Sequence, residues 1–275
     1  MSALVFALQD LWSHRAPRYA PTDPVPIEGI LRQESWSPRE EALLFAETGL
    51  SPAALHQLKE KGEEGITQIL ETQAGYFQAL TSRCVPLIGG GFTCEDLLYD
   101  EAGEKAYPVP LAPLKAGDLL LSFATHSMGW RHGHAGLVVD PVKGTVLEAV
   151  QLGMNSYLAG AKHWRNYSNF LLLRVKEVGE SLRRQVADFA KENLNDIPYS
   201  LLPGIVSPKE AEIGEGPGVH CAYLPWYAWK KGGGIDLDAT GGPIVTVADL
   251  AKSPQVEVVQ VYGLDPHLVE GHLAT

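Results

Sequence analysis

Short apolar runs separated by turn signals dominate the second half of the chain. Asp140-Pro141 and Lys143-Gly144 are turn signals of this kind, and the runs between such signals have the length and composition of buried strands. The expected strands cover 114–123, 134–139, 145–150, 170–175 and 256–262. Neighbouring strands should pair antiparallel because the turns between them are short. Residues 181–194 place their apolar side chains on one stripe, which predicts an amphipathic helix.

The first hundred residues follow a helical pattern instead. Ser37-Pro38 and Ser51-Pro52 each combine a capping hydroxyl with a proline in the first turn, and both therefore predict a helix start. Glycines 49 and 62 predict breaks, so residues 37–80 should form a series of helices. Residues 93–98 are expected to form one more short, capped helix.

Proline-rich residues 107–113 separate the two patterns, and we place a domain boundary there. The sequence therefore predicts a mainly helical region over 1–110. It also predicts an α+β domain over 111–265, with a curved antiparallel sheet packed against helices, and a tail over 266–275.

The composition mainly excludes classes of binding partner and of membrane or export segment. The formal net charge of -11 gives no general attraction to nucleic acid or to anionic lipid. No apolar run approaches the length of a membrane-spanning helix, and the first residues lack the basic region and cleavage site of a secretory leader. Three cysteines are too few for a disulfide scaffold, although pairing of Cys84 with Cys94 stays open and would leave Cys221 as the odd thiol.

Cys221 lies where a glycine-rich loop becomes an apolar, aromatic stretch. The loop is Gly216-Pro217-Gly218, and Pro225 suits the first turn of a helix that begins near the cysteine. A thiol at a helix start faces unpaired N–H groups and the positive end of the helix dipole, which favour the thiolate. The pattern indicates a nucleophile, and the alternative is a small buried hydrophobic side chain.

A base and an orienting acid are available on two neighbouring strands. His134 opens one expected strand, and Glu148 lies near the end of the next one. Glu148 stands between Leu147 and Ala149, so its carboxylate should be at least partly buried and should need a partner. These positions predict a Cys221–His134–Glu148 triad. The alternatives are a satisfied core histidine and a strand-edge carboxylate in water.

A zinc site is a competing hypothesis. His132 and His134, with His126 or with His220-Cys221, offer enough nitrogen and sulfur for the ion. However, no CxxC or HExxH spacing is present. We therefore expect no metal and no cofactor.

Read in order, five motifs resemble the circularly permuted NlpC-type cysteine peptidases, the YiiX-like group. The motifs are Leu114 to Leu120, His134 to Val139, Leu147 to Val150, Ile197 to Ser200 and Cys221 to Leu224. The resemblance covers about residues 112–265 and implies a papain-like fold whose chain order is His, Glu, Cys. It also implies that Tyr199, in a Pro-Tyr motif, lines the site, with an oxyanion-hole role or a place in the core as the two readings.

The sequence departs from that family's pattern beside the nucleophile. Ala222-Tyr223 stand where the family commonly has Ser-Glu, and His220 stands where an aromatic residue is more usual. The loop over 203–219 is longer and more acidic than expected. We count His220 and Trp130 with Tyr199 as candidate substrate-binding residues.

By this resemblance the chain is expected to be a thiol hydrolase that cleaves amide bonds in peptidoglycan stem peptides. One alternative is a lipid acyltransferase or thioesterase of the lecithin retinol acyltransferase type. Trp130, Trp164, Trp226 and Trp229 would then line an apolar groove, and packing in the core explains them equally well. Another is a non-catalytic binding module. A cell-wall substrate would place the protein in the periplasm or envelope, and delivery by a dedicated secretion system would imply an immunity protein as partner. Otherwise the chain would be cytoplasmic.

Overall fold

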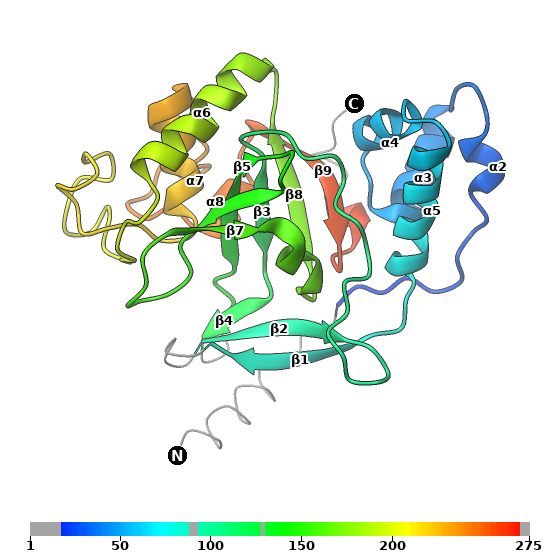
Figure 1. Cartoon of the computed structure of the whole chain (residues 1–275), viewed down its shortest axis with the longest axis horizontal. Helices are drawn as coiled ribbons and strands as arrows, with labels where there is room; N and C mark the ends of the chain where they lie inside the picture. Colours follow the sequence, from blue (N-terminus) through cyan, green and yellow to red (C-terminus); the bar gives the residue numbers. More distant parts are fainter. Residues whose placement is uncertain (1–17, 88–92, 128–129, 270–275) are drawn as a thin grey trace.

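The computed structural model describes residues 18–87, 93–127 and 130–269, which form two antiparallel sheets flanked by helices (Figure 1). The six-stranded sheet has the order β7-β6-β5-β3-β8-β9. Its strands are β3 (Leu119–Ser122), β5 (His134–Asp140), β6 (Thr145–Glu148), β7 (Tyr157–Gly160), β8 (Phe170–Val175) and β9 (Val256–Tyr262). The second sheet has the order β1-β2-β4, with β1 (Thr81–Pro86), β2 (Thr93–Tyr99) and β4 (Thr125–Ser127). The fold class is α+β, as predicted.

Helices flank the large sheet on two sides (Figure 1). On one side, beyond the edge strand β9, lie α2 (Glu28–Leu31), α3 (Pro38–Thr48), α4 (Pro52–Lys59) and α5 (Glu63–Tyr76). On the other lie α6 (Glu180–Asn193), α7 (Tyr223–Tyr227) with its continuation η2 (Ala228–Gly232), and α8 (Val247–Ala251). Two short 3₁₀ turns, η1 (Ala161–Asn166) and η3 (Pro266–Leu268), complete the elements. Among the helices of the described residues, none is both long enough and apolar enough to cross a bilayer.

The helix starts follow the caps that the sequence indicates. Ser37 and Glu40 form a reciprocal capping box at α3, and the Ser51 hydroxyl accepts from the N–H of Ala54 at α4. α3 ends at Gly49, and α5 begins after Gly62. The helices predicted over 37–80 are therefore interrupted at the two predicted glycines, Gly49 and Gly62.

Two hydrophobic clusters occupy the two faces of the large sheet. Because side chains alternate along a strand, Leu119 and Leu121 pack toward α6 and α7, whereas Leu120 packs toward the N-terminal helices. A buried ion pair ties β8 to the turn before β3: Arg174 donates from Nε and Nη2 to the two oxygens of Asp118, at 2.9 and 2.7 Å.

The expected helix over 93–98 is wrong. These residues belong to β2, and the buried side chains of Cys94 and Asp96 alternate with half-buried Thr93 and Glu95. β1 and β4 supply the backbone partners on either side, so long-range pairing overrides the local capping signal.

The domain boundary near residue 110 stays a prediction. The cluster that contains α3 to α5 also contains strand residues from the C-terminal part, and Leu50 forms a bridge with Gln260 of β9.

Candidate active site

A close approach of two loops positions Cys221. Gly218 has a φ of +124°, and a Cβ at this position would lie 2.1 Å from the carbonyl oxygen of Pro198, so the passage needs glycine. Val219 then donates its N–H to that same oxygen, and Tyr199 and Val219 form a parallel bridge. These contacts bring Tyr199 beside the cysteine.

His220 caps the helix that follows Cys221. The N–H of Tyr223 donates to His220 Nδ1 at 3.3 Å, and the N–H of Leu224 donates to the His220 carbonyl at 3.0 Å. An imidazole therefore takes the place of the usual capping hydroxyl or carboxylate. The amides of Cys221 and Ala222 lie within this first turn, where N–H groups have no acceptor four residues earlier in the helix.

His134 and Glu148 come from adjacent strands, as predicted. β5 and β6 are antiparallel with Gly136 opposite Glu148, so His134 lies diagonally across from Glu148 on the same face of the sheet. The Nε2 atom of His134 lies 3.6 Å from Glu148 Oε2, and the two side chains are 3% and 1% exposed. Gly136 makes room for the carboxylate, since a Cβ there would lie 3.2 Å from Glu148 Cγ and 2.6 Å from Val146 Cγ1.

Two further side chains hold the carboxylate in place. Trp164 donates from Nε1 to Glu148 Oε1 at 2.5 Å, and His163 Nε2 lies 3.2 Å from the same oxygen. The indole of Trp164 also stacks on the His134 ring, with centroids 5.1 Å apart and planes 11° apart. One tryptophan thus fixes both the base and its acid, a role that the sequence analysis did not assign to it.

The pKa values of the three groups are set by one another. Burial would raise the pKa of the Cys221 thiol, but hydrogen bonds with His134 and His220 and their charges lower it to about 5. Burial disfavours the charged His134 ring, yet Cys221 and Glu148 raise its pKa to about 10. The pKa of Glu148 falls to about 2 against the effect of burial, because His134 and His163 favour its charged form. At neutral pH the site is therefore a thiolate–imidazolium pair backed by a carboxylate.

The other predicted binding residues lie at different distances from the thiol. Burial and the charge of Cys221 raise the pKa of Tyr199 well above its ordinary value, so the phenol stays a hydrogen-bond donor. Trp130 is 70% exposed and packs edge-on against His132, with ring centroids 5.4 Å apart. Burial lowers the pKa of His132 and the charge of Cys221 acts against that shift, so His132 lies between Trp130 and the thiol.

Three of the four tryptophans pack in the core and do not line a groove. Trp164, Trp226 and Trp229 are fully buried in the core. The N–H of Trp226 donates to Asp236, and that of Trp229 donates to the carbonyl of Gly117, so these side chains meet protein rather than open space.

A pocket of about 220 Å³ adjoins the cysteine loop. Pro198, Gly218 and Tyr223 line it together with residues of the acidic loop over 203–217, Glu212 among them. The long acidic loop therefore forms part of a pocket next to the segment that leads into Cys221.

Of the zinc ligands suggested by the sequence, His126 lies apart from the others. The structure places His126 beside Asp96 and Cys84, whereas His134 and His220 contact Cys221. All three cysteines of the chain lie in described segments and none forms a disulfide. Across β1 and β2, Cys84 lies opposite Asp96 and Cys94 lies opposite Pro86, so the two cysteines are not paired directly across the strands and form no disulfide.

Comparison with known proteins gives one weak structural similarity. No protein-family model matches the chain, and no curated protein matches it. Among solved structures, the chain is weakly similar to the metalloprotein yiiX from Escherichia coli O157:H7, described as DUF1105. The two are 15% identical with a TM-score of 0.39, and the match covers 54% of this chain and 97% of that one. At this TM-score the similarity establishes no family, so membership of the permuted NlpC-type peptidases stays a prediction.

Proposed function

We propose that this protein is a cysteine hydrolase that cleaves amide bonds through an acyl-enzyme on Cys221. One observation carries the proposal: a buried thiol at a helix start, whose pKa is lowered by His134, shares that histidine with the buried carboxylate of Glu148, 3.6 Å from the ring. Burial alone would leave both the thiol and the imidazole neutral, so the lowered and raised pKa values reflect the arrangement of charges.

The reaction would begin with attack of the Cys221 thiolate on the substrate carbonyl carbon. The protonated His134 would then donate its proton to the departing amine as the carbon–nitrogen bond breaks, which leaves a thioester on Cys221. A water molecule, deprotonated by His134, would attack the thioester, and release of the acid would restore the thiolate–imidazolium pair. Glu148 would stay ionised throughout and hold the imidazolium in orientation.

Donors for the developing oxyanion are present near the thiol. The amides of Cys221 and Ala222 lie in the first turn of the helix, and the protonated phenol of Tyr199 lies beside Cys221. Donors fixed before the reaction stabilise charge in the transition state without reorganisation. Tyr199→Phe should therefore lower kcat more than it changes KM.

The bond that we propose as target is an amide of a peptidoglycan stem peptide, on the strength of the sequence resemblance. A second candidate is an ester or thioester of a fatty acyl chain. It is favoured by exposed apolar side chains directly after Tyr199: Leu201, Leu202, Ile205 and Val206 are 51%, 44%, 57% and 63% exposed. The three buried tryptophans no longer support that alternative.

The test is to incubate the intact protein with stem peptides and with acyl thioesters, and to search for an acyl adduct on Cys221 by mass spectrometry. Cys221→Ala should abolish adduct and turnover, whereas Cys94→Ser, which removes another buried thiol, should retain both. Turnover by Cys221→Ala at the native rate would show the proposal to be wrong. Binding of stem peptide with no adduct and no product in the native protein would favour the binding module instead.

A further inference from the structure

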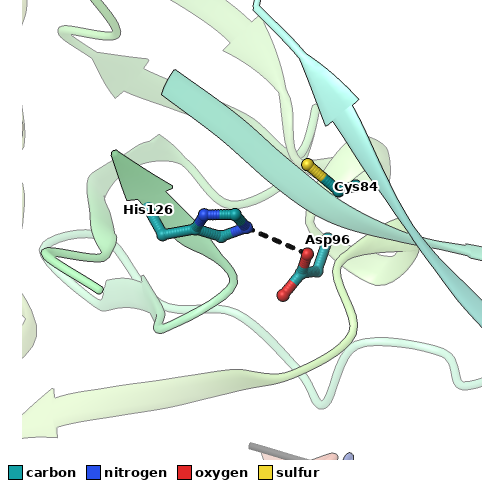
Figure 2. Close-up of side chains that lie close together, drawn as sticks. All are labelled: Cys84, Asp96 and His126. Atoms are coloured by element: carbon teal, nitrogen blue, oxygen red, sulfur yellow. Dashed lines mark hydrogen bonds and ion pairs between the residues drawn. The ribbon is translucent and has the colours of Figure 1, made fainter. Parts of the chain in front are cut away.

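The small sheet gathers a second group of chemically active side chains. Cys84 of β1 lies opposite Asp96 of β2, and His126 of β4 lies opposite Cys94 of β2. Residues 94 and 96 point to the same face of β2, because side chains alternate along a strand. Cys84, Asp96 and His126 therefore share one face of the sheet, and Figure 2 shows them pointing toward one another.

The distances within this group fit a single small cation. One ligand atom from each residue lies within 4.8 Å of the other two, and His126 Nε2 is 3.1 Å from Asp96 Oδ1. Ligands bound tetrahedrally at roughly 2.0–2.3 Å are separated by about 3.3–3.8 Å, so only small movements would close the shell. Asp96 and His126 are buried and Cys84 is half-buried, which leaves one side through which an ion can enter.

Arg131 fixes the carboxylate in an orientation suited to binding through one oxygen. Its Nη2 lies 2.8 Å from Asp96 Oδ2, while Oδ1 faces His126. Ligating carboxylates are commonly held by such outer partners. A dication with one thiolate, one carboxylate and a neutral imidazole has no net charge, so the guanidinium adds only a single positive charge beside it.

We propose that Cys84, Asp96 and His126 bind a zinc ion, with water as the fourth ligand. Thiolate and imidazole select zinc over the oxygen-seeking calcium and magnesium, and three protein ligands leave one tetrahedral position open. This site shares no residue with the Cys221 centre. It would hold β4 against the antiparallel strands β1 and β2, and β4 is followed by the strand that begins with His134.

The experiment uses full-length Cys221→Ser, so that the thiolate of the other centre cannot bind the metal. After treatment with a chelator, the protein is titrated with Zn²⁺ and, separately, with Co²⁺. We expect one metal per chain by elemental analysis and a thiolate-to-cobalt charge-transfer absorption. Adding Cys84→Ser should abolish that absorption and weaken zinc binding by more than the roughly 10–100-fold that loss of an outer-shell partner costs.

Cys94→Ser in the same background is the matched control, since it removes a neighbouring thiol and should retain the cobalt absorption. Asp96→Asn keeps the side-chain shape and should weaken zinc binding as well. Melting curves of the metal-free variants establish that each is folded. Substoichiometric zinc, cobalt absorption that survives Cys84→Ser, or binding lost in Cys221→Ser alone would each overturn the assignment.

Discussion

Replacing His134 with alanine should change how alkylation of Cys221 depends on pH. In the native protein the thiol has a pKa of about 5, so its reaction with iodoacetamide should be nearly constant above pH 6 and should fall as the pH drops through about 5. His134→Ala removes the hydrogen bond and the positive charge but leaves the thiol buried. The pKa of Cys221 should then rise from about 5 toward its ordinary 9.0, although His220 still lowers it, and the reaction should accelerate with pH up to the new pKa.

The size of the effect follows from the two pKa values. At pH 6 a thiol with pKa 5 is mostly thiolate, whereas one with pKa 9.0 is thiolate in about one molecule in 10³, so the reactive fraction falls about 10³-fold. A more basic thiolate is also a better nucleophile, and a Brønsted coefficient of roughly 0.4–0.5 over this interval returns about 40–100-fold. Alkylation at pH 6 should therefore slow by up to about 10–30-fold, the full value applying only if His220 no longer lowers the pKa.

Peptide mass spectrometry can follow Cys221 separately from Cys84 and Cys94, so no further substitution is needed. His56→Ala is the control, because His56 is a half-exposed histidine on α4 that pairs with Glu41, and its loss should leave the profile unchanged. An identical pH profile in native protein and His134→Ala would refute the thiolate–imidazolium pair. Cys221 would then be a structural cysteine.

Three further results are expected from denaturation with urea. Trp164→Phe keeps the ring stack but removes the N–H donated to Glu148, and the unfolding free energy should fall by about 1.5–3 kcal/mol. Asp118→Ala leaves buried arginine charge uncompensated and should cost about 3–5 kcal/mol. On unfolding, the thiol pKa of Cys221 returns from about 5 to 9.0 and the imidazole pKa of His134 from about 10 to 6.5. The thiol's contribution to the unfolding free energy is complete above pH 9.0 and is lost as the pH falls through 5. The imidazole's contribution is complete below pH 6.5 and is lost as the pH rises through 10. The two changes cancel between about pH 6.5 and 9, so stability should be flat in that range and should decline on both sides.

Periodicity and caps predicted the elements whose signals are local. The strands that carry His134 and Glu148 were predicted because each is a short apolar run between turn signals, and the helices from Pro38 to Tyr76 because serines and glycines mark their ends. The pair of His134 and Glu148 could be predicted because a short connection between antiparallel strands leaves few possible registers.

The support around that pair could not be predicted in the same way. His163 and Trp164 lie in η1, a 3₁₀ turn that follows β7, and nothing in their spacing indicates that they reach back to Glu148. The cap that His220 provides was also missed, because imidazole is rarely counted among capping side chains. These contacts depend on how a turn folds over the sheet, and local sequence does not encode that.

The three-stranded sheet shows where local reasoning fails most clearly. Thr93 followed by acidic residues has the signature of a capped helix, yet the segment pairs with β1 and β4 and forms the central strand of the sheet. The strand assignment puts Cys94 and Asp96 on one face, and the register then adds Cys84 and His126 from the neighbouring strands. A helix would have placed Asp96 away from both partners. The zinc hypothesis from the sequence therefore included His126 but not Cys84 or Asp96. Finding these two ligands requires the pairing of β1 and β4 with β2, which joins residues far apart in the chain.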